Sequence, residues 1–337
     1  MDSRDAQLLA VLERGLPLVR EPYAQLAGAL GRPEADVLRR VAVLRAAGGV
    51  IREISGVFDA AALGYDRTLV ALSVPDARVD AAGRTVAAHP GVSHAYRRTG
   101  AVNLWFTLAV SPDSALGPDA TAEVLAGACG APRRLILPAE RRYKLHVRFV
   151  DGGPHAPPAP GGAPRALRPL TGEQRRAVRA LQADLPARAD PFTDVAAAEG
   201  FDADALLVHA SDLLAAGRMR RYAATLRHRR VGARANVLVA WDVPPERTDA
   251  AGGALSDSDA VSHCIRRPPR PGWPYAIYTM IHGPDECACR RALAAAGERI
   301  GNPPRVELWT LREYAKRRVR FFTDDEAAWE AEYGGRA

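Results

Sequence analysis

The strings VSHAYRR at residues 92–98 and VSHCIRR at residues 261–267 decide the fold of this 337-residue chain. The two strings differ only at their fourth and fifth positions, and they lie 169 residues apart. Similarity at a constant offset is the signature of an internal duplication. The sequence therefore predicts two copies of one structural unit.

The segments that precede these strings support the duplication. Residues 5–54 and 173–221 each contain three helical segments, and the third segment ends in Ala-Ala-Gly, followed shortly by an apolar residue and arginine. Glycine at a helix end is a C-terminal cap signal. Helices joined by short turns at this spacing are typical of a winged helix-turn-helix.

The segments around and after the two strings repeat as well. RTLVALSVP at 67–75 and ANVLVAWDVP at 235–244 are predicted strands that end in proline, and later helices are predicted at 118–129 and 285–299. The order in each copy is strand–helix–strand–strand–helix–strand, which is the ferredoxin-like βαββαβ unit. We therefore expect an α+β protein, a tandem duplication of a winged helix-turn-helix plus a ferredoxin-like βαββαβ domain.

A segment rich in proline and glycine separates the two copies and predicts an exposed linker. The predicted parts are a first winged helix-turn-helix (1–55), a first ferredoxin-like domain (56–150), the linker (151–169), a second winged helix-turn-helix (170–222), a second ferredoxin-like domain with the predicted active site (223–323) and a C-terminal tail (324–337).

Composition restricts the class of protein. Hydrophobic residues make up 47% of the chain, the formal net charge is +7 and the pI is about 9.5. A basic chain fits either nucleic acid or a polyanionic small molecule as partner. No long apolar run and no signal-peptide pattern is present, so we expect a cytoplasmic protein without a membrane segment. Cys129, Cys264, Cys287 and Cys289 form no CxxC pair, so we expect no metal site of the protein's own.

Several strings resemble one enzyme family. A winged helix followed by βαββαβ resembles the Lrp/AsnC transcription regulators. The strings LRHRRVG at 226–232, WPY at 273–275, MIHG at 280–283 and EYAK at 313–316 resemble siroheme decarboxylase, an Lrp-like enzyme of heme d1 and alternative heme biosynthesis. The resemblance covers nearly the whole chain, apart from the linker and the tail.

The resemblance implies a reaction and a partner. Siroheme loses two acetate carboxyl groups and becomes 12,18-didecarboxysiroheme, and the product enters heme d1 or heme b synthesis. No cofactor is expected, because the iron is carried by the siroheme substrate. Two homologous subunits pair or are fused in this family, so we expect the two halves to form a pseudo-dimer; a homodimer of the whole chain stays open.

The chemistry implied by the resemblance suits particular residues. Arginine grips carboxylates bidentately, aromatic rings line a slot for a flat macrocycle, and histidine donates protons near neutral pH. We predict that His228 is the catalytic proton donor or contacts the substrate iron, with Arg227 and Arg229 beside it. The predicted substrate-binding residues are Arg97, Arg98, His263, Arg266, Arg267, Trp273, Tyr275 and His282, of which His263 and His282 are second candidates for the donor.

The two copies are not equivalent at this place. Where the second copy has Leu226-Arg227-His228-Arg229, the first has Phe58-Asp59-Ala60-Ala61. We therefore expect one working site, formed mainly by the second half, and interpret His146 in the first half as structural.

The alternatives are a DNA-binding regulator and a non-catalytic heme sensor. A recognition helix should present basic or amide side chains to DNA. The second-half helix at 203–216 instead carries Asp204 and Asp212 and no Lys or Arg, so we expect no specific DNA binding. The first-half helix carries Arg39, Arg40 and Arg45, which leaves weak DNA binding by that half open. A heme sensor needs the same porphyrin slot and is not separable from an enzyme by sequence.

Overall fold

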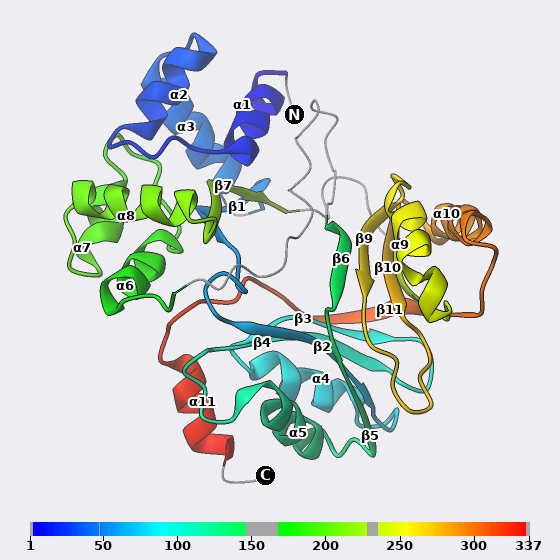
Figure 1. Cartoon of the computed structure of the whole chain (residues 1–337). Helices are drawn as coiled ribbons and strands as arrows, with labels where there is room; N and C mark the ends of the chain where they lie inside the picture. The colour runs from blue at the N-terminus through cyan, green and yellow to red at the C-terminus, as the bar shows by residue number, and fades with distance from the viewer. Residues whose placement is uncertain (1–2, 47, 146–167, 228–234, 335–337) are drawn as a thin grey trace. The chain divides into compact units, whose positions relative to one another are not determined.

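The computed structural model describes residues 3–46, 48–145, 168–227 and 235–334 (Figure 1). The described residues form two compact units, which we call the helical unit and the sheet unit. The helical unit lies within Met1–Gly64, Ala166–Val231 and Arg320–Thr323, and the sheet unit within Tyr65–Arg165, Gly232–Val319 and Asp324–Ala337.

The helical unit contains both winged helices. Each copy has three helices, as the duplication predicts, and one strand follows them. Short polar caps start two of the helices: Thr171 and Gln174 form a reciprocal capping box, and Asp202 accepts a hydrogen bond from the backbone of Ala205. The elements are α1 (Ser3–Arg14), α2 (Pro22–Leu30), α3 (Glu34–Arg45) and β1 (Ile51–Phe58), then α6 (Gly172–Leu181), α7 (Phe192–Ala197), α8 (Ala203–Ala215) and β7 (Met219–Leu226).

Strands β1 and β7 join the two winged helices. They pair antiparallel, with Ile54 opposite Ala224 and Gly56 opposite Tyr222. Ile54 and Tyr222 are fully buried, so both strands contribute buried side chains to this unit. The helical parts of the two copies therefore fold as one unit.

The sheet unit contains both ferredoxin-like copies, and the predicted βαββαβ order is confirmed in each. An additional helix, α11 (Asp325–Tyr333), lies in the segment predicted as a C-terminal tail. The first copy comprises β2 (Asp66–Ser73), α4 (Val79–Ala88), β3 (Val92–Arg98), β4 (Leu104–Val110), α5 (Gly117–Cys129), β5 (Arg133–Pro138) and β6 (Arg141–Leu145); the second comprises β8 (Ala235–Trp241), a 3-10 turn η2 (Pro245–Arg247), α9 (Thr248–Ser256), β9 (Val261–Arg266), β10 (Ile277–Gly283), α10 (Glu286–Arg299) and β11 (Arg305–Lys316).

The two copies exchange strands within one sheet. The described strands follow the order β5-β2-β4-β3-β11-β8-β10-β9-β6. Strand β11 pairs with β8 of its own copy through Arg305–Trp309 and then with β3 of the first copy through Thr310–Lys316. The first copy reciprocates, because β5 pairs with β2 and the following β6 pairs with β9. The sequence did not predict this exchange.

Each exchanged strand contacts a helix of the other copy through the same three residue types, a tyrosine, an aspartate and a glycine. Tyr143 on β6 donates a hydrogen bond to Asp249 on α9, and its ring lies over Gly252. In the other copy Tyr314 on β11 donates to Asp80 on α4, and its ring lies over Gly83 (also on α4). Both glycines leave room that a Cβ would fill, at 2.3 Å from the ring of Tyr143 and 2.4 Å from the ring of Tyr314.

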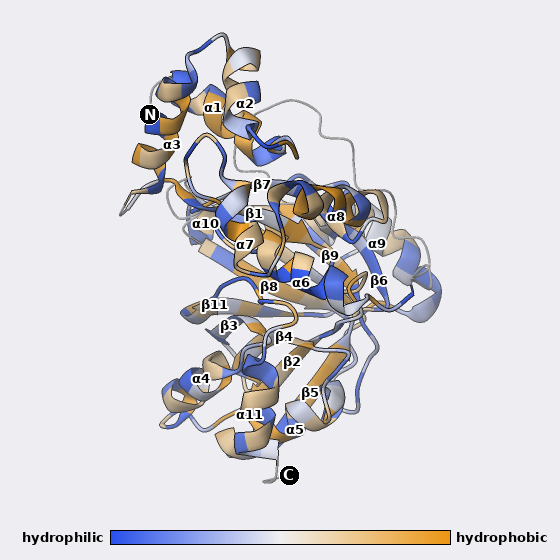
Figure 2. Ribbon diagram, turned by 90° about the vertical axis from the view of Figure 1, so that its left-hand side faces the viewer, coloured by the Kyte–Doolittle hydropathy of each residue, from blue (hydrophilic) through white to orange (hydrophobic). Residues whose placement is uncertain are grey.

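Each copy buries one face of its strands under helices and part of the other face against its partner copy. The faces under α4 and α5 and under α9 and α10 each hold a separate apolar core. The helix-free faces share a third core, to which both copies contribute Trp105, Leu137, Leu238 and Tyr278 among others. Figure 2 shows the apolar colouring concentrated on strands such as β2 and β5 and the polar colouring on outer helix surfaces. The helix-free face is thus where side chains from both copies meet.

Candidate substrate-binding face of the sheet unit

The predicted arginines divide between the two faces of the sheet, because successive strand residues point to opposite faces. Arg97 lies on the helix-covered face and pairs with Asp76 at 3.0 Å. Arg266 lies on the corresponding face of the second copy, where it pairs with Glu140 at 3.1 Å. Arg98 and Arg267 point to the helix-free face. The structure therefore does not bring the four predicted arginines together.

Arg98 and Arg267 are equivalent residues of the two copies and are both buried. Arg98 donates from Nη1 to the carbonyl of Leu308, and Arg267 donates from Nη1 to the carbonyl of Leu137. Burial lowers the pKa of each guanidinium to about 10, so both stay protonated at neutral pH. Neither forms an ion pair with any described residue, and the Nε of each has no hydrogen-bond partner there. A buried cation without a counter-charge is costly and favours an anionic partner.

A row of polar side chains crosses four strands on the helix-free face; we call it the polar row. It runs from His282 on β10 through Asn236 on β8 and Thr310 on β11 to Arg98 on β3. Arg98 Nη1 donates to Thr310 Oγ1 at 2.8 Å, and that hydroxyl donates to Asn236 Oδ1 at 2.7 Å. His282 lies directly opposite Asn236 in the register of β10 and β8. This chain of donors orients the Asn236 amide with its oxygen toward Thr310, and its NH₂ group remains the side-chain donor.

His263 lies on the same face next to the polar row. It stands opposite Met280 on β10, two residues before His282, so the two histidines occupy neighbouring strands at one end of the sheet. Its Nδ1 lies 2.9 Å from the Oγ of Ser262. The structure thus places three predicted residues, His263, His282 and Arg98, on one face of the sheet, and adds Asn236 and Thr310, which the sequence did not indicate.

The predicted aromatic residues lie in the core shared by the two copies. Trp273 is buried and donates from its ring nitrogen to the Tyr278 hydroxyl at 2.7 Å. Its ring contacts Tyr275 at a centroid distance of 4.8 Å and Trp105 at 5.8 Å. Tyr275 is only partly buried. The observed role of Trp273 is therefore packing, whereas contact of Tyr275 with a macrocycle stays a prediction.

A second cationic group on the helix-free face was not predicted. Arg142 on β6 lies opposite Ile265 and is exposed, and it forms no ion pair with a described residue. Its charge and that of Arg67 on β2 both contribute to the lowered pKa of Arg267, after the larger effect of burial. The alternation of side chains along RRYKL indicates that Arg142 points away from the face of Arg141 and Tyr143. The sequence does not show that β6 joins the other copy, so it does not show which residues Arg142 lies beside.

The predicted catalytic cluster is only partly described. Arg227 lies in the helical unit, where its Nη1 donates to the carbonyls of Gly49 at 2.7 Å and Ile51 at 2.9 Å. His228 and Arg229 lie outside the described residues, as does His146. Their roles stay predictions.

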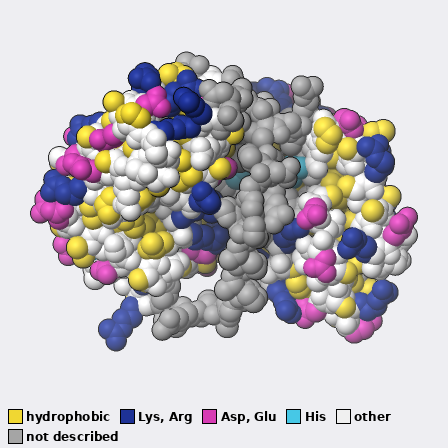
Figure 3. Space-filling model, turned by 90° about the horizontal axis from the view of Figure 1, so that it is seen from above, with side chains coloured by type: hydrophobic (Ala, Val, Ile, Leu, Met, Phe, Trp, Pro, Cys, Tyr) yellow, Lys and Arg dark blue, Asp and Glu magenta, His cyan; other side chains and the backbone are white. Residues whose placement is uncertain are grey.

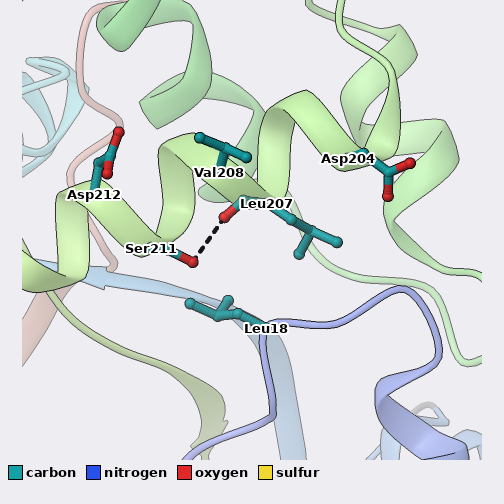
Figure 4. A pocket seen from close by; sticks show the side chains of 6 residues that line it. All are labelled: Leu18, Asp204, Leu207, Val208, Ser211 and Asp212. Carbon is teal, nitrogen blue, oxygen red and sulfur yellow. Dashed lines mark hydrogen bonds between the residues drawn. The ribbon is translucent and has the colours of Figure 1, made fainter.

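The second-half recognition helix α8 carries a shallow hollow that is apolar and acidic (Figure 4). Leu18, Leu207 and Val208 supply apolar surface, and Asp204 and Asp212 lie at opposite ends of the exposed helix face. No Lys or Arg lines this hollow, which contains none of the predicted site residues. Asp204 is paired with Arg20 at 3.1 Å, and none of the residues that line the hollow offers a positive charge to a phosphate backbone.

The arginines of the first-half recognition helix α3 are paired with carboxylates of the helical unit. Arg39 pairs with Asp36, Arg40 Nε donates to Asp5 at 2.8 Å, and Arg45 pairs with Asp184 at 2.5 Å. Basic and acidic side chains are also interspersed over the face seen in Figure 3. Paired arginines contribute less positive potential than the sequence alone indicated.

Within the described residues, no cluster of His, Cys, Asp and Glu has the composition of a metal site. A search of the same residues finds no helix that is long and apolar enough to cross a membrane.

Comparisons with known proteins agree with this architecture. A model described as the AsnC-like ligand binding domain matches residues 62–144 and 230–315, and one described as the siroheme decarboxylase NirDL-like HTH domain matches residues 5–52. The chain is 30% identical to a siroheme decarboxylase of Hydrogenobacter thermophilus, covering 96% of each protein. It is 42% identical to the siroheme decarboxylase alpha subunit of Desulfovibrio desulfuricans over 44% of this chain and 84% of that subunit.

A solved structure covers both units. The crystal structure of the siroheme decarboxylase NirDL in co-complex with an iron-uroporphyrin III analogue matches with a TM-score of 0.80 and 26% identity, over 99% of each chain. Family models, a full-length relative and a full-length structure therefore agree. This chain belongs to the siroheme decarboxylase family, in the form that joins both homologous halves in one polypeptide.

Proposed function

We propose that this chain decarboxylates siroheme, converting two acetate side chains to methyl groups with release of two CO₂. The observation that carries the proposal is the polar row, which places an imidazole, an amide and a buried guanidinium that forms no ion pair with a described residue on one face of the sheet unit. Similarity to siroheme decarboxylases over nearly the full chain supports the same substrate.

The polar row suits the binding of carboxylates. Arg98 supplies a charge that burial has stripped of solvent, and the Asn236 amide supplies a neutral donor beside His282. Arg142 adds an exposed cation on the same face. Donors held by neighbouring hydrogen bonds lose little entropy on binding, which favours a fixed orientation of the acetate group.

Decarboxylation needs a proton at the carbon that loses CO₂. The C–C bond to the carboxylate breaks, its electron pair stays on the methylene carbon, and that carbon takes up one proton. No net oxidation or reduction occurs, so we propose that the reaction needs no added cofactor and that the iron is part of the substrate. His282 and His263 in the sheet unit, together with the predicted His228, are the proposed proton donors.

The proposed assembly is a pseudo-dimer within one chain. The exchanged strands and the shared core of the sheet unit give each copy the partner that a separate subunit supplies in a two-chain relative. We further propose that specific DNA binding is absent, on the basis of the acidic α8 and the paired arginines of α3.

The test is an anaerobic titration with siroheme followed by mass spectrometry of the product. Wild type should bind siroheme and remove both acetate carboxyl groups. Asn236→Leu should bind siroheme roughly tenfold or more weakly, since it removes a donor to a charged group. Thr85→Ala, on the exposed side of α4, is the control and should bind like wild type.

Two results would overturn the proposal. Unchanged siroheme after incubation with folded wild type would refute the activity. Normal siroheme affinity of a folded Asn236→Leu variant would refute the polar row as the binding face.

A further inference from the structure

Ser262 lies directly before His263 on β9 and is nearly fully buried. Its Oγ makes two contacts, one to His263 Nδ1 at 2.9 Å and one to the backbone carbonyl oxygen of Met280 at 3.1 Å. Met280 is the residue opposite His263 on β10. The serine hydroxyl therefore connects the imidazole to the backbone of the neighbouring strand.

The two contacts select one tautomer of the imidazole. A carbonyl oxygen can only accept a hydrogen bond, and a serine hydroxyl has one proton to donate. Both contacts are hydrogen bonds only when Ser262 donates to Met280 and His263 donates from Nδ1–H to Ser262. If the neutral ring carried its proton on Nε2 instead, the hydroxyl would have two acceptors and one proton, and one hydrogen bond would be lost.

The first copy contains the same pair without this selection. Ser93 Oγ lies 3.0 Å from His94 Nδ1, but its second neighbour is the Thr107 hydroxyl at 2.6 Å. Thr107 stands opposite His94, as Met280 stands opposite His263. Because a hydroxyl can donate or accept, the Ser93 contact is compatible with either tautomer of His94. Met280 has no side-chain hydroxyl, and the Ser262 hydroxyl instead contacts a backbone carbonyl, which can only accept.

We propose that Ser262 is a positioning residue that holds neutral His263 in the Nδ1–H tautomer, so that Nε2 is the nitrogen that gives a proton to the substrate. This inference rests on the proposed decarboxylase function. In the step, the Nε2–H bond of the imidazolium breaks, a C–H bond forms at the methylene carbon, and the C–C bond to the departing CO₂ breaks. The neutral ring that remains already carries its proton on Nδ1, the form that Ser262 stabilises, and solvent restores the proton at Nε2.

The tautomer can be read without substrate. Nitrogen-15 NMR of the full chain with labelled histidine distinguishes a protonated from an unprotonated ring nitrogen, and His263→Gln identifies the His263 resonances by their loss. We expect the neutral wild-type ring to be protonated at Nδ1. Ser262→Ala should shift the population toward the Nε2–H form, and Ser262→Thr should restore the wild-type pattern. A wild-type ring protonated at Nε2, or an unchanged tautomer in Ser262→Ala, would overturn the proposal.

Single-turnover kinetics connect the tautomer to the reaction. Ser262→Ala should slow product formation about 5-fold with little change in siroheme affinity, which is the loss expected for one hydrogen bond. Ser93→Ala, the equivalent change in the first copy, should react like wild type. A shifted tautomer with an unchanged rate would refute the catalytic link. Inactivity of wild type itself would refute the decarboxylase function, whereas the tautomer assignment would still be decided by the NMR measurement.

Discussion

The contact between Tyr143 and Gly252 gives a sharp prediction about the exchanged strands. A Cβ at position 252 would lie 2.3 Å from the Tyr143 ring, a separation at which one group must move, whereas a Cβ at position 253 of the same helix meets nothing within 4 Å. Overpacking in a well-packed contact costs about 1–3 kcal/mol. Replacing a helical glycine by alanine returns about 0.5–1 kcal/mol through the backbone. We therefore expect Gly252→Ala to lower the free energy of unfolding by about 1–2 kcal/mol, and Gly253→Ala to raise it by about 0.5–1 kcal/mol.

Thermal unfolding followed by circular dichroism measures both changes. For a unit of this size, 1 kcal/mol corresponds to about 2–4 °C in Tm. The Tm of Gly252→Ala should therefore lie several degrees below that of wild type, and the Tm of Gly253→Ala a few degrees above it. A second change, Tyr143→Ala, should remove most of the penalty of Gly252→Ala in a double-mutant cycle. If Gly252→Ala is as stable as Gly253→Ala, the ring of Tyr143 is not held against α9 and the account of the strand exchange is wrong.

Three further predictions follow from charges and from the asymmetry of the copies. Burial raises the pKa of Glu326 on α11 to about 7, well above its usual value, so the folded state binds the proton more tightly and the free energy of unfolding should fall as pH rises from about 5 to 7. Urea unfolding at several pH values should show that Glu326→Gln removes roughly 1–2 kcal/mol of this fall, after allowance for partial exposure. An identical pH dependence in both proteins would contradict the prediction. His228→Ala should reduce the rate of single-turnover decarboxylation about 10²–10⁴-fold, whereas His146→Ala should reduce it much less. The reverse result would show that the active site belongs to the first half and not the second. A mobility-shift assay near physiological salt should detect no nanomolar, sequence-dependent DNA binding, and such binding would favour a regulator.

The sequence predicted the order of elements well because the duplication repeats local signals. Proline-terminated strands, helix-end glycines and the repeated VSH string each depend on residues close together in the chain. The pairing of β6 with β9 and of β11 with β3 depends instead on contacts far apart in sequence. RRYKL and EYAK read as ordinary strands, and nothing local in them indicates which copy they join.

The candidate site was predicted less completely, for two physical reasons. Adjacent arginines such as Arg97 and Arg98 alternate between faces, so counting cations overestimates how many can contact one ligand. Polar partners such as Asn236 and Thr310 gain their importance from a hydrogen-bond chain across three strands, which composition cannot reveal. Arg98 could be predicted because the repeat places it at the position of Arg267, and His263 and His282 because they lie on neighbouring predicted strands; whether they bind substrate stays a prediction.

The measurement that tests the central claim most directly is the amount of CO₂ released from siroheme by the purified full chain under anaerobic conditions, without added cofactor. We predict two molecules of CO₂ for each siroheme consumed, with a product that has lost both acetate carboxyl groups. Bound siroheme that releases no CO₂ would contradict the account and identify the chain as a tetrapyrrole-binding protein without decarboxylase activity.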